Sequence, residues 1–234
     1  MPKRLQREIE KLKKHILALG AEVEESLYLA VRSIELRDYE MAKKVIENDL
    51  DIDQMEVDLE EECLKVLVLH QPVAIDLRFI IAILKINNDM ERIGDLTVNM
   101  SQWSRYLDPT EKLEFPPEIS SMAEKTQAML RRSLDALVNM NSSIAYEVCA
   151  ADDEVDDLNH AMYKMVEDKM RDSTENLKGL IQILMISRSL ERIADHATNI
   201  AEDVIYLVDG DIIRHGREGC TPPSQKSDTE PEDE

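Results

Sequence analysis

A nine-residue pattern with the side chains of a metal site occurs twice in this 234-residue chain, 100 residues apart. Glu, Arg, Ile, Asp and Asn occupy the same offsets in 91–99 and in 191–199. On a helix, the Glu, Asp and Asn are spaced four residues apart and stack along one stripe. Two acidic side chains at this spacing destabilise a helix by about 0.2–0.5 kcal/mol. A stripe of oxygen ligands built twice despite this repulsion indicates a bound cation.

The acidic stripe of the first copy has a partner on the preceding helical segment. An antiparallel hairpin of two helices brings residues equidistant from its turn to the same level. Asp49 is paired in this way with Asp95, and Asp53 with Glu91, about a turn centred on Pro72. The side chains of these four acids are therefore expected to converge.

The second half of the chain repeats the arrangement about a turn centred between residues 173 and 174. There, Asp152 is level with Asp195, and Asp156 is level with Glu191. We expect two carboxylate quartets, each followed by an asparagine one turn further along. The candidate metal ligands are Asp49, Asp53, Glu91, Asp95 and Asn99 in the first half, and Asp152, Asp156, Glu191, Asp195 and Asn199 in the second.

The ligand atoms of both quartets are all oxygens. Oxygen ligands suit hard cations such as ferric iron, manganese, magnesium and calcium. Zinc usually also takes His or Cys, but carboxylates alone do not exclude it. The ligand positions flank the apolar seam of each helix. The expected metal sites therefore lie in surface grooves, open to water, phosphate or a partner.

Apolar residues recur at helical spacing through almost the whole chain. Turn and breaker residues divide it into expected helices near 4–36, 39–69, 73–107, 117–139, 142–171 and 175–208. Helices three and six align at an offset of 100, and helices two and five at 103. The expected fold is all-α, with tandem pseudo-symmetric three-helix bundles over 1–108 and 117–215. A linker over 109–116 would join them, and a disordered acidic tail would follow over 216–234.

The composition limits the class of function. The net charge of −21 leaves no basic stripe, so nucleic-acid binding is not expected. Three distant cysteines indicate a reduced, cytoplasmic protein. No run of 18 apolar residues is present, and no phosphate-binding loop or nucleophile–base motif is visible. We therefore expect a protein that is not an enzyme.

Three motifs make the chain similar to the PhoU family, the accessory and regulatory proteins of bacterial high-affinity phosphate transport. The first is Gln-Pro-Val-Ala-Ile-Asp-Leu-Arg over 71–78, and the others are the Glu-Arg-Ile-x-Asp stretches that begin at Glu91 and Glu191. The resemblance covers about residues 3–212. The second hairpin departs from the family pattern because 175–178 reads Glu-Asn-Leu-Lys, and the acidic tail also lies outside it.

The resemblance implies polynuclear iron or zinc clusters at the paired carboxylates, and a homodimer. It also implies a negative regulator of the phosphate response. Such a regulator works with the ATPase subunit of the phosphate ABC transporter and with a sensor histidine kinase, and reaches the membrane only through these partners.

Two other functional classes compete with a metal-binding regulator. The first is a metal-free helical scaffold, because Arg92 and Arg192 could neutralise the acidic stripes. The second is a ferritin-like di-metal protein. That class requires Glu-x-x-His pairs inside the bundle core, and the chain contains no Glu-x-x-His.

Overall fold

The computed structural model describes residues 3–104, 116–172 and 176–210, and these ranges form an all-α protein with no strand. The helices are α1 (Lys3–Leu36), α2 (Tyr39–His70), α3 (Ile75–Ser104), α4 (Pro117–Asn139), α5 (Ser142–Asp172) and α6 (Leu177–Asp209). The expected fold class is confirmed. The expected tail, the linker up to residue 115 and the end of the third helix at 105–107 fall outside the described residues.

The helix boundaries follow from local backbone chemistry. Asp38 caps α2, where its side chain accepts a hydrogen bond from the Met41 backbone N–H at 3.0 Å. Gln71 ends α2 in the left-handed conformation, with a φ of 44°. Ala74 is also left-handed, with a φ of 51°, so α3 begins at residue 75 instead of at the expected residue 73.

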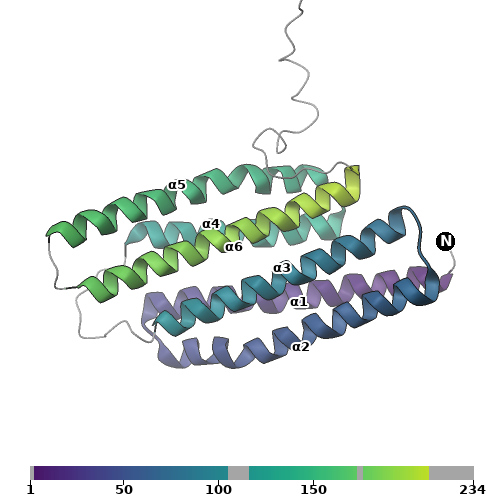
Figure 1. The fold of residues 1–234 in the computed structure, drawn as a ribbon, viewed down its shortest axis with the longest axis horizontal. Coiled ribbons are helices and arrows are strands. Elements are labelled where there is room, and N and C mark those ends of the chain that lie inside the picture. Colours follow the sequence, from purple (N-terminus) through teal and green to yellow (C-terminus); the bar gives the residue numbers. More distant parts are fainter. Residues whose placement is uncertain (1–2, 105–115, 173–175, 211–234) are drawn as a thin grey trace, which may run out of the picture.

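The helices form two three-helix bundles that lie side by side (Figure 1). Within each bundle every helix packs against the other two. The bundles meet through contacts of α1 with α4 and of α3 with α6. In the described chain, α2 contacts only α1 and α3, and α5 contacts only α4 and α6, so α2 and α5 form opposite edges of the molecule.

Aliphatic and methionine side chains fill the core of both bundles. Leu19, Ile86 and Ile193 are fully buried, and each such side chain contributes about 1.5–3 kcal/mol relative to exposure. The two bundles approach closely at Gly20 on α1, where an added Cβ would lie 2.9 Å from Leu134 on α4. The contact between α1 and α4 at this point joins the two bundles.

Both cysteines within the described residues, Cys63 and Cys149, are buried and are not joined in a disulfide. None of the described helices is long and apolar enough to cross a membrane.

Candidate metal centres

The first quartet lies at a close approach of α2 and α3. Gly94 makes this approach possible, because an added Cβ there would lie 3.3 Å from the Ile52 side chain and 3.7 Å from Asp49 Oδ1. The Asp49 carboxylate therefore rests against α3, one residue before Asp95.

The electrostatics show that the four acids of the first quartet act on one another. The pKa of Asp49 is raised to about 6, first by burial and then by the charges of Asp53, Asp95 and Glu91. The pKa of Glu91 is also raised, first by burial and then by Asp95. The four carboxylates thus form one cluster of like charges across α2 and α3.

The second quartet has the same organisation across α5 and α6. Burial, followed by the charges of Asp195 and Asp156, raises the pKa of Asp152 to about 7. Burial and the same two charges also raise the pKa of Glu191. The pKa of Asp195 is raised by burial and then by Asp156. The acids that lie at equal distances from each turn are therefore electrostatic neighbours in both hairpins.

Both quartets lie outside the apolar core, with every member half-buried or exposed. Arg92 is the nearest described cation of the first quartet, with its guanidinium 3.3 Å from Glu91 and 3.5 Å from Asp95. In the second quartet, the charge of Arg192 acts on Glu191 and Asp195 and opposes the rise in their pKa. Arginine neutralises Glu91, Glu191 and Asp195 only in part, because the pKa values of these three acids remain raised.

The oxygen donors of each quartet have the right chemistry for a hard cation, but the side chains are not closed around one. Within 3–104, 116–172 and 176–210, no three His, Cys, Asp or Glu side chains are grouped so that they could hold a metal ion. Like-charged carboxylates repel one another when no counter-ion lies between them. The role of these residues as metal ligands stays a prediction.

The two candidate asparagines lie in different surroundings. Asn99 is exposed on α3. Asn199 donates a hydrogen bond from its amide to Asp89 Oδ1, at 3.4 Å, in the contact between α6 and α3. His196 Nδ1 lies 2.8 Å from the same Asp89 oxygen. Asn199 therefore contributes to the junction between the bundles in this structure.

Two carboxylates next to the first quartet were missed by the motif analysis. The pKa of Glu56 is raised first by burial and then by Glu60, Glu91 and Asp53. The amide of Asn87 donates to Glu56 Oε1 at 3.3 Å. The signal in the sequence is the spacing of three and then four residues from Asp53 to Glu56 to Glu60, which continues the acidic stripe along α2.

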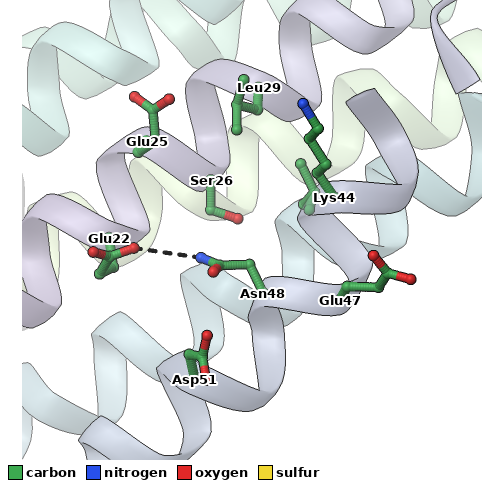
Figure 2. A pocket seen from close by; sticks show the side chains of 9 residues that line it. Glu22, Glu25, Ser26, Leu29, Lys44, Glu47, Asn48 and Asp51 are labelled. Carbon is green, nitrogen blue, oxygen red and sulfur yellow. Dashed lines mark hydrogen bonds between the residues drawn. The ribbon is translucent and has the colours of Figure 1, made fainter. Parts of the chain in front are cut away.

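An acidic groove lies on the other side of α2, against α1. Figure 2 shows its lining, which includes Glu22 and Glu25 from α1 and Glu47 and Asp51 from α2. Asn48 donates to Glu22 across the groove at 3.4 Å. Lys44 is the one basic residue among the nine that line it. Acidic side chains therefore border α2 on both sides, in this groove and in the first quartet.

Comparison with known proteins follows the same division into halves. The PhoU domain model matches residues 16–104 and 119–204. The chain belongs to the PhoU family. The phosphate-specific transport system accessory protein PhoU homolog of Clostridium acetobutylicum is 34% identical over 204 residues, which cover 87% of this chain and 93% of that protein.

Two crystal structures have the same fold. PhoU from Pseudomonas aeruginosa superposes with a TM-score of 0.86 and 35% identity, over 88% of this chain and 99% of that one. The phosphate transport system regulatory protein PhoU from Streptococcus pneumoniae gives a TM-score of 0.85 at 29% identity, over 90% and 100% of the two chains. The names of these relatives describe accessory or regulatory proteins. Each PhoU domain match contains one carboxylate quartet.

Proposed function

We propose that this PhoU-family chain is a metal-binding, non-enzymatic regulator of phosphate-specific transport. The observation that carries the proposal is the quartet of interacting carboxylates that occurs once in each half of the chain. The names of the relatives supply the process, because they describe accessory or regulatory proteins of phosphate transport.

Each quartet is proposed to hold a polynuclear cluster, with iron or zinc as the first candidates and manganese, magnesium or calcium as others that accept carboxylates. Bound cations would neutralise acids whose pKa values are now raised by burial and by one another. Cations would also draw the splayed side chains together. The ligands would be the four carboxylates of each quartet, with Asn99 or Asn199 beside them.

A metal-free scaffold is the second candidate, and two observations favour it. Arg92 already contacts two acids of the first quartet, and no three candidate ligands in the described part of the chain are grouped around a common point. The ferritin-like alternative has less support, because the quartets lie outside the apolar core of both bundles.

The route of regulation is proposed to be docking on proteins. An acidic chain with a net charge of −21 complements basic surfaces, here those of the transporter ATPase subunit and the sensor histidine kinase. The proposal includes a homodimer and negative regulation of the phosphate-starvation response. Docking between exposed charges should weaken as the salt concentration rises.

Two measurements test the proposal. Elemental analysis of protein purified without chelator should find metal in the wild type. The variant Asp53→Asn/Glu91→Gln should contain about half as much metal, because it removes ligands from one of the two proposed sites. The substitution Lys11→Gln, remote from both quartets in sequence, serves as the control.

Deletion of the gene should derepress phosphate-starvation genes in phosphate-rich medium. Normal repression in the deletion strain would contradict the regulatory role, and metal-free wild-type protein would contradict the metal role.

A further inference from the structure

A line of exposed apolar residues runs along the outer face of α2. Leu50, Val57, Leu64 and Val68 are spaced seven, seven and four residues apart, so they share one face of the helix. Their exposed fractions range from 46% to 74%. No described helix covers this face, because α2 contacts only α1 and α3. We call these four residues the α2 stripe.

The second half of the chain shows what the same positions look like on a solvated helix. At the offset of 103, the buried residues Ile52 and Leu59 of α2 correspond to Val155 and Met162 of α5, which are also buried. The structural alignment of the two helices is therefore the one read from the sequence.

On this alignment, the apolar character of the stripe is specific to the first half. The positions equivalent to Leu50, Val57, Leu64 and Val68 are Asp153, His160, Glu167 and Arg171, all exposed. Glu167 and Arg171 form an ion pair on the surface. The fold does not require apolar side chains at these positions, so their presence on α2 needs another explanation.

Acidic side chains line both long edges of the α2 stripe. Asp53, a member of the first quartet, and Glu60 lie on the edge toward α3. Glu47 and Asp51 lie on the opposite edge, in the groove shared with α1 (Figure 2). An apolar centre with acidic edges complements an amphipathic helix whose apolar face is flanked by lysine and arginine.

We infer that the α2 stripe is the docking surface for a basic amphipathic helix of a partner protein. The inference rests on the proposed function, in which the chain acts through protein partners, and it assigns that role to one face of one helix. The partner helix presents apolar residues every seven positions to the stripe, and its flanking cations reach the acidic side chains on either edge. A second copy of this chain or an anionic membrane would instead bring negative charge against negative charge.

A synthetic peptide tests the chemistry of this surface. The stripe spans 19 residues of α2, or about 27 Å between its first and last residues, so an amphipathic peptide of about 21 residues with a leucine heptad face and lysine flanks matches its length. We expect the labelled peptide to bind the full chain in a fluorescence anisotropy titration. Binding should weaken in high salt, and a peptide with glutamate flanks should not bind.

The second half of the chain supplies the substitutions for this test. The variant Leu50→Asp/Val57→His/Leu64→Glu places the α5 residues on α2, and it should bind the lysine peptide about tenfold or more weakly. The control Asp153→Asn/His160→Gln/Glu167→Gln changes the equivalent face of α5 and should bind like the wild type. Unchanged melting temperatures establish that both variants are folded. Failure of the wild type to bind, or equal binding by the stripe variant, overturns the inference.

A reporter assay in cells separates this inference from the proposed function. The stripe variant should derepress a phosphate-starvation reporter in phosphate-rich medium, as gene deletion does, while its metal content matches the wild type. Normal repression by the variant in a strain where deletion derepresses overturns the inference alone. If sedimentation showed that the variant no longer dimerises, the stripe would belong to the dimer interface. If the wild type bound phosphatidylglycerol vesicles and the variant did not, the stripe would bind a membrane. Either outcome overturns the inference.

Discussion

The two halves of the molecule share a framework and differ in what surrounds each quartet. In the first half, Glu56 and Glu60 extend the acidic stripe, whereas Asn159 and Tyr163 occupy the equivalent positions in the second. Asn87 donates to Glu56, and its counterpart Ser187 donates to Asn159 at 2.6 Å. Both hairpins therefore have a hydrogen bond between their two helices at this position, while the charge beside the quartet differs between the halves.

The pKa values express the same contrast. Asp152 of the second quartet reaches a pKa of about 7, and Asp49 of the first reaches about 6, with burial as the largest cause in both. Burial thus acts more strongly on this aspartate of the second quartet, and the first quartet has two further acids beside it. Substitutions at equivalent positions of the two quartets can test whether the quartets also differ in stability and metal binding.

Metal removal should have the largest effect on stability. A metal that binds only the folded state at about 1,000 times its Kd stabilises it by about 4 kcal/mol. We expect excess chelator to lower the melting temperature of the wild type, as followed by circular dichroism with elemental analysis of the same sample. Asp53→Asn/Glu91→Gln and Asp156→Asn/Glu191→Gln should each abolish only part of this difference. Identical melting curves before and after confirmed metal loss would support a metal-free scaffold.

The sequence could predict the helices. It could also predict which acids of each quartet face one another across a hairpin, and that the quartets flank the apolar seam of each helix. Apolar spacing and turn residues are local signals, and the symmetry of a hairpin converts them into contacts between distant residues. The role of Asn199 could not be read in this way. Its contact with Asp89 joins two bundles, and no turn fixes their relative placement.

Other residues were harder to place for a similar reason. Trp103 falls on the exposed side of the expected third helix, but in the structure it is partly buried and packs against the core. Glu56 was missed because its importance depends on burial against α3 and not on a repeated motif. The symmetry of the repeats predicts the framework well, and it is uninformative where the halves differ.

Gly94→Val should have the next largest effect, confined to the first half. An added Cβ would lie 3.3 Å from Ile52, so the larger side chain must push α2 away from α3. Overpacking of this kind costs about 1–3 kcal/mol, which urea denaturation can measure. Metal content should fall at the first quartet only. The matched control is Ala194→Val on α6, the equivalent residue; a loss of metal from both quartets in Gly94→Val would contradict independent sites.

Asp152→Asn should change the pH dependence of stability in the metal-free protein. The pKa of Asp152 is about 7 in the folded state against an ordinary 3.8, so the folded state holds this proton more tightly than the unfolded state. Stability from this group is present at low pH and falls as the pH rises from about 4 to about 7. At pH 7.5 the amide should therefore stabilise the chelated protein by about 1–2 kcal/mol after allowance for solvent screening.

The comparison for this prediction is Asp49→Asn, which should stabilise the chelated protein less because its pKa is raised only to about 6. Urea denaturation in chelator at pH 5 and pH 7.5 measures both variants. With metal present, both substitutions should destabilise, because each removes a proposed ligand. A larger gain from Asp49→Asn than from Asp152→Asn would show that the second quartet is not the more strained of the two.

Arg92→Gln should have the smallest effect on folding and a clearer effect on metal binding. The guanidinium lies 3.3 Å from Glu91 and 3.5 Å from Asp95, but the side chain is 52% exposed, so its loss should change the unfolding free energy by only about 0.2–1 kcal/mol. Removing a cation from beside the proposed ligands should raise the affinity of the first quartet for added metal, as measured by isothermal titration. Arg192→Gln is the matched variant in the second half, where Arg192 acts on Glu191 and Asp195. If neither substitution altered metal affinity, the arginines would not compete with a cation, and the argument that they neutralise a metal-free scaffold would lose its support as well.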